Sequence, residues 1–228
     1  MEDQSLYSEH LCKFLELSDE SHIWPGAKIA NWWSDVFPNR PTKLPFDRVC
    51  RDELKNIARV DSPFSDLEVF VAIMAWGGMR RNNGRRFAMS GDLSQTCEII
   101  GGLREGKLDR GDAFSRFFGM RKSGRLSGVS AAYYTKLIFF CGANHNGYIM
   151  DQWTSKSVNL ICEDPVVHLT YAGHVSDKND AGTYSEFCDV IEELARKGKW
   201  TPEKTEMRLF SHGGRKKGAW RQYVVDHS

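Results

Sequence analysis

The chain has 228 residues, of which 41% are hydrophobic and 27% charged, so it can form a globular core of ordinary size. Lys and Arg number 31 and Asp and Glu number 30, and bulk charge therefore gives no indication of a nucleic-acid partner. The six cysteines form no CxxC pair, which argues against a zinc ribbon, an iron–sulfur cluster or a secreted disulfide framework. No apolar run has membrane-spanning length and the N-terminus lacks a signal-peptide core, so we expect a cytoplasmic protein with reduced thiols and no membrane partner.

Hydrophobic periodicity in the N-terminal half predicts helices separated by polar loops. Ser65 and Glu68 form a capping box ahead of the apolar stretch LEVFVAIMAW, which predicts a buried helix that a Gly-Gly pair ends. Residues 37–47 hold three prolines and predict a surface loop, and residues 80–86 predict a basic loop. Further helices are predicted within residues 1–22, over 92–104 and over 111–121.

The C-terminal half predicts a hairpin between two helices, followed by a glycine-rich loop and more helices. The turn is the segment SGRLSGVS, and an apolar helix over residues 131–141 follows it. The tail shows strand character only in WRQYVV. Because helices dominate throughout, the sequence predicts a mainly α fold. Further helix starts are predicted at Asp151, at a second capping box of Thr183 and Glu186, and at Thr201-Pro202.

The hairpin offers a binding site for an anion. Gly128 permits a turn in which successive backbone N–H groups point outward together. The following helix adds its own unpaired N–H groups and the positive end of its dipole. Such a site binds a DNA phosphate without reading the base sequence, whereas the alternative is an ordinary turn between two helices. The residues concerned are Ser127, Gly128, Val129 and Ser130.

Asp151 precedes the predicted helix QWTSKSVNLI and has two interpretations. It can be a simple N-cap, a role that Asp often has. The same geometry also holds a carboxylate in its ionised form, since the helix dipole and N–H groups favour the charge. Cleavage of an N-glycosidic bond builds positive charge on the deoxyribose, which a fixed anion stabilises, and such a carboxylate can also orient an attacking water or nucleophile.

The combination of an LxGV hairpin, an apolar helix containing YYTKLIFF and an Asp at the next helix start resembles the helix-hairpin-helix (HhH-GPD) DNA glycosylase superfamily. The similarity extends over roughly residues 65–210, and the 23 residues from Gly128 to Asp151 suit one helix plus a loop. It is closest to the 8-oxoguanine DNA glycosylase branch, in particular bacterial proteins found near antiphage systems. The resemblance implies a two-lobed helical fold with a DNA-binding cleft, with lobes near residues 1–110 and 111–228, and a catalytic role for Asp151.

One position departs from this pattern. Bifunctional members of the superfamily carry a Schiff-base lysine in the first turn after the hairpin, where this chain has Ala132. Lys136 lies one turn further along the same helix face and could act as the nucleophile from a dry pocket. The alternative is a side chain that extends to solvent or to a phosphate. In that case the enzyme is monofunctional, and Asp151 activates water.

Surface and pocket residues follow from the same interpretation. Tyr133 and Trp153 could stack on a flipped base, although both could also belong to the core. The histidines lack ligand spacing, so we expect no metal site, and no cofactor beyond a monovalent cation that the hairpin could bind. The basic residues expected to contact the DNA backbone, rather than to form only a solvated face, are Arg80, Arg81, Lys122 and Arg125.

Two other classes of function stay open at this point. The first is a non-catalytic HhH module that binds or senses modified DNA; Asp151 argues against it and Ala132 argues for it. The second is a structural partner in a multiprotein defence system. Pocket shape decides which base a glycosylase excises, so the sequence leaves two candidates: oxidised guanine, which the branch suggests, and a hypermodified phage pyrimidine.

Overall fold

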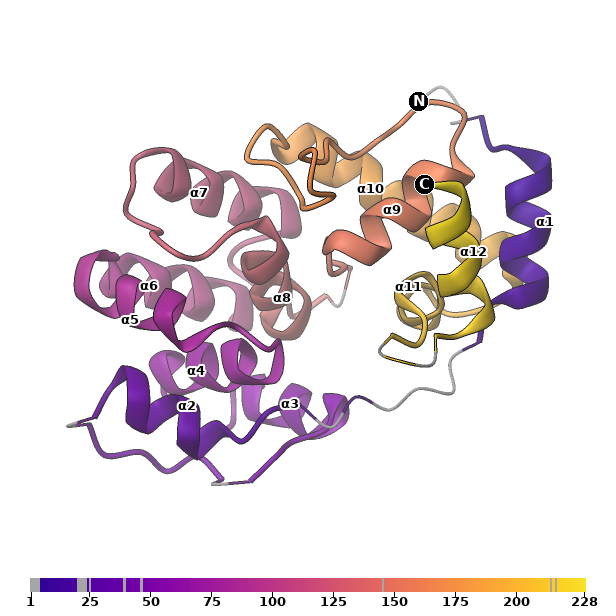
Figure 1. Ribbon diagram of the computed structural model, residues 1–228. Coiled ribbons are helices and arrows are strands. Elements are labelled where there is room, and N and C mark those ends of the chain that lie inside the picture. The colour runs from indigo at the N-terminus through magenta and orange to yellow at the C-terminus, as the bar shows by residue number, and fades with distance from the viewer. Residues whose placement is uncertain are drawn as a thin grey trace. The chain divides into compact units, whose positions relative to one another are not determined.

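The computed structural model describes residues 5–19, 24, 26–38, 40–45, 47–144, 146–213, 215 and 217–228. Within these ranges the chain forms twelve α-helices and no sheet, with extended pairing only as two isolated bridges (Figure 1). The mainly α prediction is therefore confirmed. The chain divides into two compact units, which we call the central unit (residues 23–147) and the terminal unit (residues 1–22 and 148–228). None of the described helices is both long and apolar enough to cross a lipid bilayer.

The central unit is built around a helix that is buried on all sides. This helix, α4, contacts α2, α3, α6 and α8, and its residues from Val69 to Ala75 are fully buried because the sequence is apolar around the whole helix (Figure 1). Its predicted capping box at Ser65 and its end at Gly77 are both confirmed. The helices of this unit are α2 (Ile29–Val36), α3 (Arg51–Ala58), α4 (Asp66–Trp76), α5 (Arg81–Ser90), α6 (Leu93–Arg104), α7 (Arg110–Lys122) and α8 (Ala131–Cys141).

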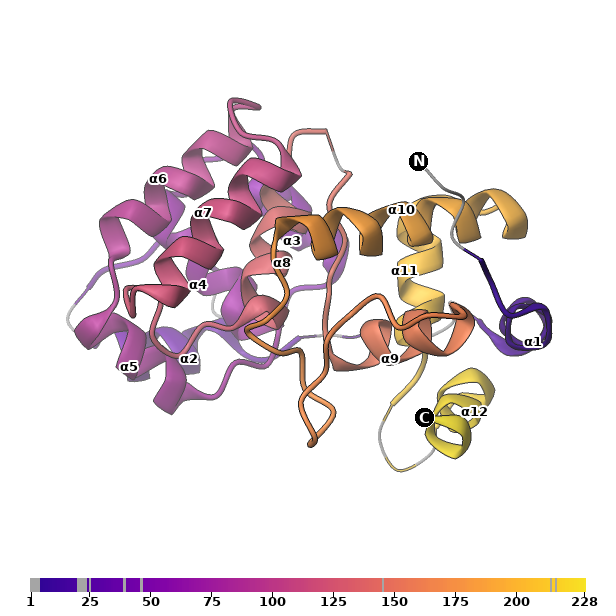
Figure 2. The ribbon, with the colours of Figure 1, turned by 90° about the horizontal axis from the view of Figure 1, so that it is seen from above.

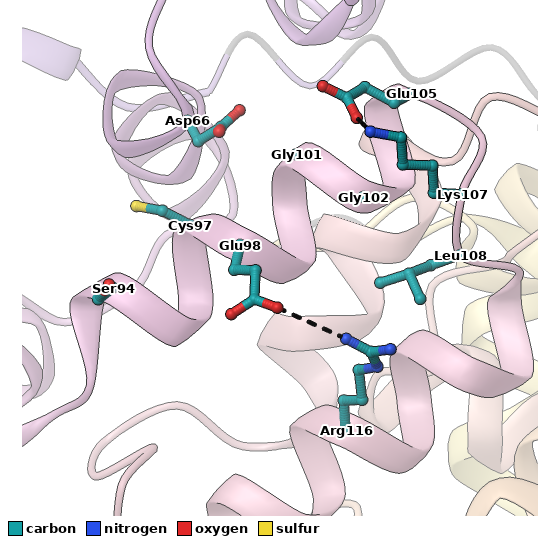
Figure 3. Close-up of a pocket in the computed structure, with 10 residues that line it drawn as sticks. All are labelled: Asp66, Ser94, Cys97, Glu98, Gly101, Gly102, Glu105, Lys107, Leu108 and Arg116. Atoms are coloured by element: carbon teal, nitrogen blue, oxygen red, sulfur yellow. Dashed lines mark ion pairs between the residues drawn. The ribbon is translucent and has the colours of Figure 1, made fainter.

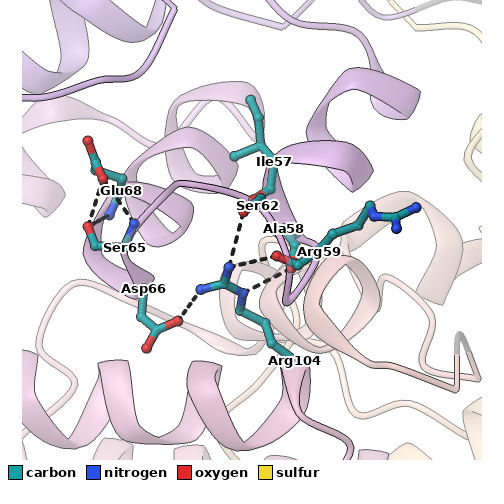
Figure 4. Close-up of polar contacts among 8 residues, drawn as sticks. All are labelled: Ile57, Ala58, Arg59, Ser62, Ser65, Asp66, Glu68 and Arg104. Atoms are coloured by element: carbon teal, nitrogen blue, oxygen red, sulfur yellow. Dashed lines mark hydrogen bonds and ion pairs between the residues drawn. The ribbon is translucent and has the colours of Figure 1, made fainter.

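A single arginine ties three of these helices together. The guanidinium of Arg104, on α6, donates to the carbonyls of Ala58 (3.1 Å) and Arg59 (2.7 Å) at the end of α3 (Figure 4). It also donates to the hydroxyl of Ser62 (3.1 Å) and pairs with Asp66 in the first turn of α4. The side chain is buried, and these bonds satisfy carbonyls that the end of α3 leaves without helical partners.

The helices that carry the hairpin pack closely. α6 and α7 run side by side, and α8 contacts both (Figure 2). Tyr134 on α8 packs edge-to-face on Phe114 and stacks on Phe117, at ring separations of 5.1 and 5.5 Å. These contacts hold the start of α8 at a fixed place relative to α7.

The terminal unit joins both ends of the chain. Its central helix, α9, contacts the four other helices of the unit. Phe14 on α1 is fully buried and packs edge-to-face against Trp200 and Trp220, at ring separations of 5.8 and 5.1 Å. The N–H of Tyr7 donates to the carbonyl of Ile161 (2.8 Å). The helices are α1 (Ser8–Leu17), α9 (Gln152–Ile161), α10 (Ala181–Gly198), α11 (Pro202–Phe210) and α12 (Ala219–His227).

One prediction for the central unit is wrong, and two of its helices were not predicted. The segment predicted as a basic loop belongs largely to α5, because Gly84 within it and Phe87 directly after it are buried. Phe87 packs on Phe70 of α4 at 5.0 Å, and a Cβ at Gly84 would lie 2.6 Å from the ring of Trp32. Neither α2 nor α3 was predicted; each has only eight residues, which is short for a periodicity signal.

The terminal unit also differs from prediction at three points. α10 begins at Ala181 because Asp180, not Thr183, is its N-cap: the Asp180 carboxylate accepts the Thr183 N–H at 2.9 Å. The tail forms α12 rather than a strand, with Trp220 and Val224 buried at helical spacing. The lobe boundary expected near residue 110 falls inside the central unit, since the packing of α1 on α9 and α12 joins the two ends of the chain.

Candidate active site

The hairpin between α7 and α8 lies where the sequence predicts it. Its Leu126 and Val129 side chains are fully buried, and the Val129 N–H donates to the Leu126 carbonyl (3.2 Å). Gly128 has a φ of +82°, which disfavours any other residue, and a Cβ there would lie 2.6 Å from the backbone oxygen of Asn83 on α5. The turn therefore requires glycine for two reasons, its backbone conformation and its close approach to α5.

The hairpin presents several unpaired donors. Within the described ranges, the backbone N–H groups of Ser127, Gly128 and Ser130 donate to no backbone carbonyl. Ser130 is the N-cap of α8, and its hydroxyl makes no capping hydrogen bond. The first turn of α8 adds further N–H groups and the positive end of the helix dipole. This arrangement can bind an anion such as a phosphate.

Lys136 lies on the buried side of α8 and is only 7% exposed. Its side chain follows the helix back toward the N-terminus, and Nζ donates to the carbonyl oxygen of Ala132 at 2.7 Å. The extended, solvated side chain considered above is therefore not observed. Instead, the amine lies against the backbone of Ala132, the position at which the hairpin alignment places the usual Schiff-base lysine.

The surroundings of Lys136 include two other features that bear on chemistry. A Cβ at Gly77 would lie 2.8 Å from Cδ of Lys136, so the lysine stem occupies space that only glycine leaves open at the end of α4. The ring of Tyr133 lies 5.7 Å from Nζ. Burial raises the pKa of the Tyr133 hydroxyl, and the positive charge of Arg80 opposes that rise. Three predicted site residues thus lie close together in the central unit: Arg80, Tyr133 and Lys136.

Asp151 is the N-cap of α9, and its two carboxylate oxygens have different roles. Oδ1 accepts the N–H groups of Trp153 (2.8 Å) and Thr154 (3.1 Å), while the Thr154 hydroxyl accepts the Asp151 N–H (3.0 Å). Within the described part of the chain, Oδ2 accepts no hydrogen bond. The N-cap interpretation is confirmed, yet the cap uses only one oxygen of this half-buried residue and leaves Oδ2 available to a ligand.

Arg221 on α12 is a charged neighbour of Asp151 that the sequence analysis does not identify. It is 4% exposed, and its guanidinium lies 4.0 Å from the centre of the Trp153 ring. Burial lowers the pKa of Arg221 to about 10, and the negative charge of Asp151 opposes that change. Nζ of Lys156 lies 5.5 Å from the same ring, so two cations lie against Trp153. The role of Trp153 in base stacking stays a prediction.

Two of the basic residues predicted to bind phosphates are engaged by the protein itself. Arg81 forms an ion pair with Asp35. Arg125 donates to the side chain of Gln95 (2.6 Å) and lies 4.0 Å from the carboxylate of Asp92. Both would have to share or exchange these partners to bind DNA, which reduces the free energy that each contact can contribute.

The side chains of Arg80 and Lys122, by contrast, are exposed. Neither forms an ion pair within the described ranges. Nζ of Lys122 lies 5.1 Å from the ring of Phe118, one turn earlier on α7. These two side chains are the better candidates for contacts with a phosphate backbone.

A pocket among the described residues lies elsewhere, on α6, and its lining contains none of the predicted site residues. It is an open depression of about 640 Å³ whose lining includes Asp66, Cys97, Glu98 and Arg116 (Figure 3). Burial, with the nearby negative charge of Asp66, raises the pKa of the Cys97 thiol to about 11, so this thiol is not an activated nucleophile. No group of three or more metal-ligating side chains occurs in the described ranges.

The fold and site define a class: an all-helical protein in which a glycine hairpin precedes an apolar helix and then an Asp-capped helix. A family model described as "Putative 8-oxoguanine DNA glycosylase OGG-like protein" matches residues 22–210, and the chain belongs to this family. The match includes the hairpin, Lys136 and Asp151, and it ends before α12. No curated protein and no solved structure matches the chain.

Proposed function

We propose that the protein is a DNA N-glycosylase that excises a modified base. The family description, which names 8-oxoguanine DNA glycosylases, supports this class of reaction. The observation that carries the proposal is Asp151, a carboxylate with one oxygen fixed by α9 and the other available. A fixed anion of this kind stabilises a cationic sugar more than a neutral one, and so it lowers the barrier to loss of the base.

Lys136 would supply the nucleophile. Its hydrogen bond to the Ala132 carbonyl uses an N–H, so a neutral amine keeps its lone pair for attack. The amine would attack C1′ of the deoxyribose, and the base would leave with the electron pair of the glycosidic bond and accept a proton. Opening of the sugar ring would then give an imine, from which elimination of the 3′ phosphate cuts the strand. Without this step, Asp151 would direct a water molecule to C1′ and the enzyme would be monofunctional.

Contacts with DNA would be mostly electrostatic. The unpaired N–H groups at Ser127, Gly128 and Ser130 would bind one phosphate, and Arg80 and Lys122 would bind others. Such contacts fix the position of the duplex without reading its bases. Recognition of the base would then fall to aromatic side chains such as Tyr133, which lies beside the Lys136 amine.

The proposal is tested with duplexes that contain single modified bases, 8-oxoguanine first. Wild-type protein should release the base, whereas Asp151→Asn should keep DNA binding and lose about a hundredfold or more in excision rate, judged by comparable electrostatic groups. Borohydride should trap a protein–DNA adduct that Lys136→Ala abolishes. Lys122→Ala is the matched control, because its amine is exposed and should leave trapping intact. Wild-type excision by Asp151→Asn would show that the residue is only a cap.

The identity of the base and the biological role extend the same proposal. The family description favours oxidised guanine, and a hypermodified pyrimidine of phage DNA, which would indicate antiphage defence, is the other base to include. Ala132, at the usual lysine position, favours a second candidate, a non-catalytic module that only binds modified DNA. Selective binding without release of any base would support that second candidate and reject the glycosylase.

A further inference from the structure

Arg221 is anchored deep in the terminal unit. Its Nε donates to the carbonyl of Phe210 at 3.0 Å, and Nη2 donates to the carbonyls of Phe210 and Ser211. These carbonyls belong to the C-terminal end of α11, which lacks helical partners for them. The pKa of Arg221, lowered by burial to about 10, still leaves the group positively charged at neutral pH. A charged side chain that is 96% buried is costly and needs a specific explanation.

The third guanidinium nitrogen has no hydrogen-bond partner. Within the described ranges, Nη1 of Arg221 forms neither a hydrogen bond nor an ion pair, although Asp151 attracts it electrostatically. The residue next to Nη1 is Gly213, where a Cβ would lie 3.2 Å from Nη1, so the absence of a side chain at this position leaves that side of Nη1 uncovered. The backbone of Gly213 is not left-handed, so its conformation does not require glycine.

The guanidinium also lies beside the candidate catalytic group. It stacks on the ring of Trp153, and the Trp153 N–H is one of the two that hold Oδ1 of Asp151. A deoxyribose placed against Oδ2 brings its own 5′ and 3′ phosphates with it. An unopposed phosphate near Asp151 would be repelled by the carboxylate, and a fixed cation in the same place removes that repulsion.

We propose that Nη1 of Arg221 binds a DNA backbone phosphate, one of the two that flank the nucleotide whose sugar faces Asp151. The inference rests on the proposed function, and it adds a contact that family membership does not assign, because Arg221 lies outside residues 22–210. Since the other two nitrogens are already anchored, little side-chain freedom is lost when the phosphate binds. The contact would hold the flipped nucleotide rather than the undamaged duplex.

The test uses full-length protein and a duplex with a tetrahydrofuran abasic analogue, so that the identity of the base does not matter. Methylphosphonates neutralise, one at a time, the 5′ phosphate, the 3′ phosphate and a control phosphate several nucleotides away. One flanking methylphosphonate should weaken wild-type binding about tenfold or more, the usual size of one hydrogen bond to a charged group. Arg221→Met should weaken binding to the abasic duplex without any methylphosphonate by a similar factor. It should also lose sensitivity to that one methylphosphonate and keep its response to the others.

A second variant separates the contact from the structural role of Arg221. Gly213→Val should keep the bonds from Arg221 to α11 and cover Nη1 with its side chain, so its melting temperature should stay near wild type while it behaves like Arg221→Met in binding. It also decides the question if Arg221→Met does not fold.

Equal methylphosphonate effects in wild type and Gly213→Val would overturn the inference. So would stabilisation by inorganic phosphate alone, dependent on Arg221, with no methylphosphonate effect, because the ligand would then be a free anion and not DNA. A wild-type protein that does not prefer the abasic duplex over an undamaged one would instead reject the proposed function.

Discussion

Substitution of Gly128 by Ala tests the geometry of the hairpin. The φ of +82° costs an alanine about 1–2 kcal/mol. The new Cβ would also lie 2.6 Å from the Asn83 oxygen, and such overpacking against backbone costs about 1–3 kcal/mol. The two effects together predict a loss of about 2–5 kcal/mol in the free energy of unfolding.

Gly124 offers a matched control in the same loop. Its φ is +77°, but a Cβ there would meet no atom within 4 Å. Gly124→Ala should therefore cost only the conformational part, about 1–2 kcal/mol. Urea unfolding followed by circular dichroism should give a midpoint for Gly128→Ala that lies below that of Gly124→Ala by about 0.5–1.5 M, for a slope of about 2 kcal/mol per molar. If the two midpoints coincide, the close approach of Gly128 to α5 is wrong.

Three further predictions concern pH and salt. Burial raises the pKa of the Glu68 carboxyl, but hydrogen bonds from Lys43 and Ser65 lower it by more, so the net pKa is below the usual value. The ionised carboxylate therefore stabilises the fold at pH 7, and the stability lost in Glu68→Gln should vanish as pH falls below the folded pKa. Thermal melts of both proteins across this pH range check the prediction. Burial raises the pKa of the Cys162 thiol to about 12 from an ordinary 9. The free energy of unfolding should therefore fall as pH rises from about 9 to about 12, by up to about 1.4 kcal/mol per pH unit for this thiol. Cys162→Ala should flatten that fall, whereas Cys12→Ala, at an exposed position, should not. In DNA binding, Lys122→Ala should reduce the slope of log affinity against log salt concentration by about one. Arg125→Ala should reduce it by less, because Arg125 is already paired with Asp92. Equal slopes for wild type and both variants would show that neither side chain contacts a phosphate.

The elements that the sequence predicts well are those whose signals are local. α8 is a continuous apolar run, and its bounds, Ala131–Cys141, are those predicted. The start of α9 at Asp151 follows from a capping residue before a helical pattern. α5 is missed because arginines and asparagines fill its first two turns, and α12 is missed because WRQYVV has aromatic and β-branched residues that favour a strand. Only burial against other helices explains their apolar positions.

The site divides in the same way. The sequence identifies Gly128 and Asp151 because a turn and a cap have local signatures. It does not identify Arg221, because an arginine in a basic tail looks like a solvated charge until its burial beside Trp153 is known. Gly77 is missed for a related reason: its value lies in the space that it leaves for the Lys136 stem, more than fifty residues away in the chain.

The two ends of the chain meet in one unit, and this has a consequence for synthesis. The central unit is contiguous, so it can fold as it leaves the ribosome. α1 is made early, but the helices against which it packs, α9 and α12, are made after the whole central unit. At about 5–20 residues per second, the 211 residues from Ser18 to Ser228 take roughly 10–40 s. During that time Phe14 has no partner, and a chaperone that binds short apolar segments of nascent chains would find it there.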